Sequence, residues 1–207
     1  MKLTTIQRLG GASLIGGSIL FMAYSALWPS LLPISEAQRD FSRLVLDPHW
    51  TWLAGLAFAG VLLMLFGFGA VYSRLYADAG MTGLLGFVLI EAAYLLQACK
   101  VTWEIFLFPI IARDPSAVTL LRDGILRHHP LIVVFKTSAS VTIFLGILLF
   151  CFALVRSKQF PKAAGILIFV GALVYGSGPL ISVVVAIGGI VVLSMGCLIL
   201  GLKLMRE

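Results

Sequence analysis

Long apolar runs bounded by charged residues or proline make up most of the chain. A membrane-spanning helix needs about 20 mostly apolar residues. Six runs are close to this length: residues 9–28, 50–73, 83–112, 131–155, 162–178 and 180–203. Only Gly176-Ser177-Gly178-Pro179 separates the last two runs, which predicts a tight turn there. The pattern predicts an all-α polytopic membrane protein, a six-helix bundle forming a single integral membrane domain over residues 1–207.

The first run has two interpretations. It follows Lys2 and Arg8 and resembles a secretory signal peptide, with Ala23 and Ser25 before a cleavage point. Gly10, Gly11, Gly16 and Gly17 favour a packed span instead, because small residues let two helices approach closely. Ala12 with Gly16 and Ser13 with Gly17 are small residues four apart, and the last two runs add further glycines: Gly171, Gly176, Gly188, Gly189 and Gly196. Faces of this kind also suit docking, so a membrane-protein partner or a second copy is expected there.

Composition excludes a soluble domain. The chain is 60% hydrophobic and 12% charged, whereas soluble domains average about 45–50% apolar and about 25% charged residues. Its three cysteines all lie in apolar runs and are too few for a disulfide framework. The net charge of +6 does not indicate a nucleic-acid partner, because the basic residues do not cluster on a soluble face.

The basic residues instead orient the chain in the bilayer. Loops on the side of the N-terminus hold eight basic residues against two acidic ones, and the opposite loops hold five of each. The eight are Lys2, Arg8, Arg74, Arg156, Lys158, Lys162, Lys203 and Arg206. Because short cytoplasmic loops are enriched in Lys and Arg, we predict a multi-pass protein of the inner (plasma) membrane with both termini in the cytoplasm.

Two outer loops are long enough to carry structure. The segment from Ser35 to Leu46 begins with a helix-capping residue, and Asp47-Pro48 ends it. Between Pro115 and Arg127, apolar residues recur at helical spacing. Both patterns predict short amphipathic helices at the outer interface, which either shield the bundle or form a lid. The outer aromatic belt is predicted to contain Trp28, Trp50 and Trp52.

Polar residues interrupt the third apolar run at Glu91, Gln97, Lys100 and Glu104. An ionisable group at the bilayer centre costs about 2.5–3.5 kcal/mol on insertion scales, so such groups usually face the bundle interior. Three of them, Gln97, Lys100 and Glu104, fall within about 60° on a helix, with Glu91 on the opposite side. We therefore expect this helix at the centre of the bundle, with Arg156 or Lys158 reaching towards Glu91.

The fourth run adds Lys136, followed one turn later by Ser140. Glu104 and Lys136 lie about 12 Å and about 8 Å from the outer ends of their helices, close enough in depth to pair. In one interpretation they form an interhelical ion pair, shared with Lys100, that docks the two helices.

In the other interpretation, surplus positive charge lines an outward-facing pocket between the third and fourth spans. Lys100 and Lys136 then attract an anionic group, and Glu104 pairs with them or exchanges a proton. The rest of this predicted ligand site is Gln97, Trp103 and Ser140, although Trp103 also fits a packed core position.

The histidines all lie at the outer ends of spans, beside proline: His49, His128 and His129. Together with Asp47 they offer nitrogen and carboxylate ligands of the kind that zinc accepts. Adjacent histidines seldom bind one ion together, so we predict no metal site and assign the histidines a lid or pH-sensing role. Haem b fits less well, because its ligands normally lie within the hydrocarbon. No cofactor is indicated.

These features predict a ligand-binding or transport-type protein for a small solute or ion. One alternative is a non-catalytic accessory subunit of a larger membrane complex. The other is an interfacial enzyme that uses the three histidines. A non-enzyme is favoured over this enzyme. The sequence has no phosphate-binding loop, nucleophile elbow or Cys-x-x-Cys, so phosphoryl transfer by such a loop and a thiol redox relay are not supported. In layout, the chain resembles the substrate-binding subunits of energy-coupling-factor vitamin transporters, which implies solute binding and supplies no site residue.

Overall fold

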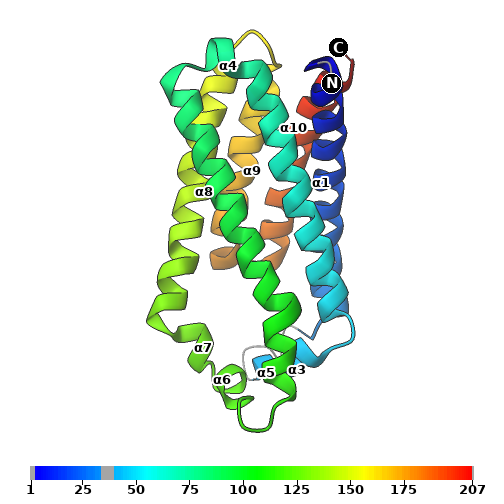
Figure 1. The fold of residues 1–207 in the computed structure, drawn as a ribbon, viewed down its shortest axis with the longest axis vertical. Coiled ribbons are helices and arrows are strands. Elements are labelled where there is room, and N and C mark those ends of the chain that lie inside the picture. The colour runs from blue at the N-terminus through cyan, green and yellow to red at the C-terminus, as the bar shows by residue number, and fades with distance from the viewer. Residues whose placement is uncertain (1–2, 34–39, 207) are drawn as a thin grey trace.

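The computed structural model describes residues 3–33 and 40–206, and this part of the chain is helical without strands. Five long helices form one bundle (Figure 1): α1 (Leu3–Leu31), α4 (Trp50–Thr102), α8 (Pro130–Arg156), α9 (Lys162–Ile181) and α10 (Val183–Arg206). At one end lie α3 (Phe41–Leu46), α5 (Phe108–Arg113), α6 (Thr119–Arg122) and α7 (Ile125–His128), which together are called the cap. The π-helix η1 (Trp103–Leu107) joins α4 to α5. Both chain ends lie at the opposite end of the bundle, which is called the terminus end (Figure 1).

Gly80 reverses the chain within α4. Its backbone has φ 56° and ψ −168°, a conformation that only glycine adopts readily. The helix therefore consists of two antiparallel arms, residues 50–79 and 81–102 (Figure 1). The second arm packs closely on α8. A Cβ added at Gly86 would lie only 2.4 Å from the backbone nitrogen of Phe150, so the absence of a side chain at this position permits the contact.

Four helical segments of the described chain are long and apolar enough to cross a membrane: Thr5–Leu31, Trp50–Arg113, Pro130–Arg156 and Val183–Arg206. A shorter apolar helix covers Lys162–Gly178. The second segment contains the reversal at Gly80, so it runs along the bundle in both directions (Figure 1). The predicted all-α, membrane-type architecture is confirmed at this level.

Glycines bring the helices of the bundle into close contact. A Cβ added at Gly10 would lie 2.0 Å from the Cβ of Ala70 on α4, and one at Gly11 would lie 2.7 Å from the carbonyl oxygen of Gly201 on α10. On α9, a Cβ at Gly171 would lie 2.2 Å from a backbone nitrogen of α10. These small-residue faces are therefore covered by helices of the same chain.

Two of the glycines expected to dock a partner remain uncovered. A Cβ at Gly176 or Gly188 would meet nothing within 4 Å. A partner or second copy at such a face stays a prediction.

The turn predicted at Gly176-Ser177-Gly178-Pro179 is wrong. Helix α9 continues through these residues to Ile181, and the extended Ser182 separates it from α10. The Ser182 hydroxyl accepts a hydrogen bond from the Val185 N–H at 3.3 Å, which caps the next helix. A serine cap therefore sets the turn, and the Gly/Pro cluster remains helical.

The two loops predicted to lie on the outer side also differ from the prediction. Residues 35–39 of the helix predicted over Ser35–Leu46 lie outside the described part of the chain. Helix α3 begins only at Phe41, because Asp40 is extended and accepts the Ser42 N–H at 3.0 Å. A hydrogen bond from the Ser42 hydroxyl lowers the pKa of the Asp40 carboxyl.

The single helix predicted between Pro115 and Arg127 is replaced by α6 and α7, which meet at Gly124 with φ 70°. A glycine in the left-handed region ends one helix and lets the chain change direction. Residues of both short helices pack against the rest of the protein. They contribute to a second apolar cluster in which Leu121 is buried with Leu44 and Trp50.

Candidate functional site

A cavity of about 540 Å³ lies between the cap and the bundle, and it is called the cap cavity. Residues of α1, α4, η1, α8 and all four cap helices line it. Most of the wall is apolar or aromatic, with four charged side chains set into it. Its volume falls within the range of about 300–1,000 Å³ that is typical of ligand pockets.

Four of the six predicted ligand-site residues line this cavity: Lys100, Trp103, Glu104 and Lys136. Gln97 and Ser140 are not among its lining residues. Ser140 is exposed, and its hydroxyl donates to the backbone carbonyl of Lys136 at 2.9 Å. Ser140 lies one turn beyond Lys136 on α8, and its hydroxyl is used within that helix.

The charges of the cap cavity are unbalanced. Lys100 Nζ lies 3.0 Å from Glu104 Oε1, and the Glu104 side chain is only 12% exposed. Within residues 3–33 and 40–206, Lys136 and Arg127 form no ion pair within 4.0 Å. Three basic side chains against one carboxylate leave a formal surplus of two positive charges.

The interhelical Glu104–Lys136 pair considered from the sequence is therefore not formed. Lys100 takes the carboxylate instead, because residues four apart lie on adjacent turns of the same helical face. Lys136, on the other helix, is left facing the cavity.

A π-helical turn shapes the wall beside Glu104. The N–H of Phe108 bonds to the carbonyl of Trp103, five residues earlier. Proline has no N–H and its ring crowds the carbonyl four residues before it, so Pro109 explains why the turn widens here. The Trp50 indole donates to the Glu104 backbone carbonyl at 2.7 Å, which ties the first arm of α4 to η1. Such bulges are frequent at functional sites.

Aromatic rings form the apolar part of the wall. The ring centroids of Trp28 and Trp50 lie 5.3 Å apart, and those of Phe41 and Trp50 lie 5.6 Å apart. Trp103 packs against Phe135 at 5.0 Å. Trp50 is 1% exposed, so its predicted place in a lipid-facing belt is wrong. Its ring instead packs in the second apolar cluster, with Leu44 and Leu121, which is called the cap cluster, and its N–H has a backbone acceptor.

His128 is the last residue of the cap helix α7, and His49 and His129 lie next to the ends of α4 and α8; none of the three lines the cavity. His49 Nδ1 is 2.9 Å from Asp47 Oδ1, and His129 Nδ1 accepts the Leu131 N–H at 3.3 Å as it caps α8. In the described ranges, no group of three or more His, Cys, Asp or Glu side chains is arranged to hold a metal ion. Their lid or pH-sensing role stays a prediction.

Sequence reasoning missed several lining residues, above all Arg127. This residue belongs to α7, and its inward position depends on the break at Gly124. The proline at position 109 was the available signal for the π-helical turn. No local pattern indicated that Phe41 and Leu121 would contribute to the same wall.

Glu91 lies apart from the cap cavity. Its side chain is half-buried, and Oε1 has no hydrogen-bond partner in the described protein. Neither Arg156 nor Lys158, which were predicted to reach towards Glu91, forms an ion pair with it among the described residues. The Arg156 guanidinium instead lies 5.3 Å from the ring centroid of Phe152.

Comparisons with protein-family models, curated proteins and solved structures find no match to this chain. The chemistry of the cap cavity is therefore the basis for a functional assignment.

Proposed function

We propose that this chain is a six-span membrane protein that binds a small organic anion in the cap cavity, as a binding or transport-type protein. The six spans are α1, the two arms of α4, α8, α9 and α10, with both termini in the cytoplasm and the cap outside. One observation carries the proposal: the cavity has a surplus of two positive charges and a wall that is otherwise largely apolar.

The charge surplus favours an anionic ligand. Lys100 is neutralised by Glu104 at 3.0 Å, whereas Lys136 and Arg127 have no acidic partner within 4.0 Å in the described chain. Lys136 lies about 8 Å along α8 from the outer end of the span. Basic groups at such depth are normally paired or face a polar cavity. A carboxylate or similar anion in the cavity supplies the missing partner.

The aromatic wall favours an organic ligand over a simple inorganic ion. Trp28, Trp103 and Phe135 present ring surface to the same cavity as the basic groups. Burying an apolar body against this surface contributes about 25 cal/mol per Å² of area removed from water. The expected ligand therefore has one anionic group and an apolar body.

Thermal unfolding of the purified protein with benzoate tests this proposal, with benzyl alcohol as the uncharged control. A ligand present at 100 times its Kd stabilises the folded protein by about 2.7 kcal/mol, which raises Tm by about 5–10 °C for a chain of this size. Benzoate is expected to stabilise the wild type, and Lys136→Met is expected to abolish the shift.

The matched control is Lys162→Met, which removes an exposed lysine outside the cap cavity and is expected to keep the shift. If a variant with apolar residues at Lys100, Glu104 and Lys136 is stabilised by benzoate as strongly as the wild type, the proposed site is wrong.

Thiol labelling tests the orientation separately. Ser116→Cys and Lys158→Cys are introduced into a chain without native cysteines, and intact cells are treated with a membrane-impermeant maleimide. The proposed topology predicts labelling at 116 and none at 158 until the cells are broken. The reverse pattern would overturn the topology.

A further inference from the structure

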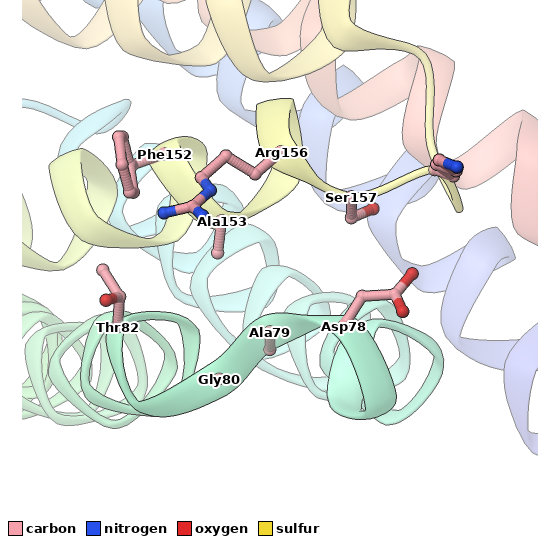
Figure 2. A pocket seen from close by; sticks show the side chains of 9 residues that line it. Asp78, Ala79, Gly80, Thr82, Phe152, Ala153, Arg156 and Ser157 are labelled. Carbon is pink, nitrogen blue, oxygen red and sulfur yellow. The ribbon is translucent and has the colours of Figure 1, made fainter.

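A second cavity, of about 490 Å³, lies at the terminus end and is called the terminus-end cavity. It is formed between the turn at Gly80 and the end of α8 (Figure 2). It shares no lining residue with the cap cavity. Its ligand is therefore separate from the anion of the cap cavity, and only its place at the cytoplasmic side rests on the orientation proposed above.

The terminus-end cavity offers basic and hydroxyl groups that have no acidic partner. Arg156 and Lys158 are exposed, and neither has a carboxylate within 4.0 Å among the described residues. Ser157 Oγ accepts the Gln159 N–H at 3.1 Å, so its proton remains available for donation. Thr82 adds a second hydroxyl group to the lining. Guanidinium, ammonium and hydroxyl donors are the groups that bind phosphate oxygens in proteins.

Asp78 is the acidic member of the lining. Its Oδ2 accepts a hydrogen bond from Gln159 Nε2 at 3.3 Å, and its carboxylate points away from the Arg156 guanidinium in Figure 2. Two basic side chains against one carboxylate leave a formal surplus of one positive charge. This surplus matches the single negative charge of a phosphodiester.

Phe152 indicates that the ligand is part of a lipid. It lies one helical turn before Arg156, is 52% exposed, and its ring lies under the guanidinium at 5.3 Å. An exposed phenyl ring next to a basic group at the end of a spanning helix presents apolar surface to an acyl chain and positive charge to the headgroup. Basic pockets between spanning helices at the cytoplasmic side are recognised binding sites for anionic headgroups.

We propose that the terminus-end cavity binds the phosphodiester headgroup of an anionic phospholipid from the adjacent leaflet. Arg156 pairs with the phosphate, and Thr82, which lies at the same end of the cavity, donates a hydroxyl hydrogen bond to it (Figure 2). Lys158 adds positive charge to the cavity, Ser157 at the other end donates to the polar group esterified to the phosphate, and Phe152 contacts the acyl chain.

Lipid binding is tested on full-length protein by native mass spectrometry, titrating phosphatidylglycerol or phosphatidylcholine into the same detergent. Wild-type protein is expected to retain one phosphatidylglycerol in preference to phosphatidylcholine. Each of Arg156→Gln and Lys158→Gln is expected to weaken this binding about fivefold, the contribution of one basic residue at an anionic surface. Thr82→Val is expected to weaken it about threefold through one lost hydrogen bond.

The matched controls are Arg206→Gln and Thr137→Val, which replace an exposed arginine and an exposed threonine outside both cavities. Both are expected to bind phosphatidylglycerol like the wild type. An equal loss in Arg206→Gln would overturn the proposal in favour of general surface attraction. All variants are expected to keep the wild-type Tm in phosphatidylcholine, which separates lost binding from lost folding.

Inorganic phosphate distinguishes a lipid headgroup from a soluble ligand. Millimolar phosphate is expected neither to displace phosphatidylglycerol nor to raise Tm in phosphatidylcholine. If phosphate alone stabilises the wild type and Arg156→Gln removes that effect, the ligand is a soluble phosphate and the lipid assignment is overturned. Equal retention of both lipids by the wild type would overturn the charge-based proposal.

Discussion

Replacing Gly80 with alanine isolates the energetic role of the reversal in α4. The residue has φ 56° and ψ −168°, a region that is costly for any side chain by about 1–3 kcal/mol. A Cβ added there meets nothing within 4 Å, so no steric clash contributes. Gly80→Ala is therefore expected to lower the free energy of unfolding by about 1–3 kcal/mol through backbone conformation alone.

Gly69 provides the matched control within the same helix. A Cβ added at this position also meets nothing within 4 Å, but the backbone of Gly69 is helical. Gly69→Ala is expected to raise the free energy of unfolding by about 0.5–1 kcal/mol, because alanine has a higher helix propensity than glycine. Replacing glycine by alanine thus changes the free energy of unfolding in opposite directions at the two positions.

The two variants are compared by equilibrium unfolding in mixed micelles, with loss of helical circular dichroism as the signal. Gly80→Asn adds a second comparison. Asparagine tolerates the left-handed helical region, but that region requires ψ near 45°, so it is not expected to rescue stability. If Gly80→Ala unfolds like the wild type, the reversal does not depend on the conformation of Gly80 and the reasoning is refuted.

Three further predictions concern the cap and the packing of the bundle. Trp50→Phe leaves the Glu104 backbone carbonyl without its donor and is expected to cost about 1–3 kcal/mol in chemical unfolding; unchanged stability would contradict the inferred hydrogen bond. Gly171→Val places a side chain against the backbone of α10 and is expected to cost about 1–3 kcal/mol or more, whereas Gly176→Val, which has open space, is expected to be tolerated. The folded-state pKa of Asp40 lies below its ordinary value of 3.8, so its contribution to cap stability is present above about pH 4 and is lost as the pH falls through the folded pKa. Hydrogen exchange of the α3 amides is expected to show this acid loss in the wild type and not in Asp40→Asn.

The long apolar helices were readable from the sequence because most of them have an apolar run with charged or proline boundaries. The Lys100–Glu104 pair was also predictable, since a spacing of four residues brings two side chains together on any helix. Lys136 could be placed near them by depth alone, because short connections make neighbouring spans antiparallel.

Features that depend on tertiary contacts were not readable in this way. Trp50 has the sequence signature of an interfacial tryptophan, yet cap residues cover it and it is 1% exposed. Arg127 lines the cap cavity only because Gly124 breaks the loop into two helices. The turn at Ser182 was missed because Gly and Pro in the preceding residues are stronger local turn signals than a single serine cap.

The cap and the bundle have separate apolar clusters, one around Trp50, Leu121 and Leu44 and the other around Phe68 and Phe150. Regions with their own small set of buried contacts can open locally while the rest of a protein stays folded. Opening of the cap would expose the cap cavity to water without melting the helices around Phe68. The residence time of a bound anion would then depend on how often the cap opens. Substitution of Leu44, which is buried in this cluster and does not line the cap cavity, would change the release rate of the anion and leave its contacts unchanged.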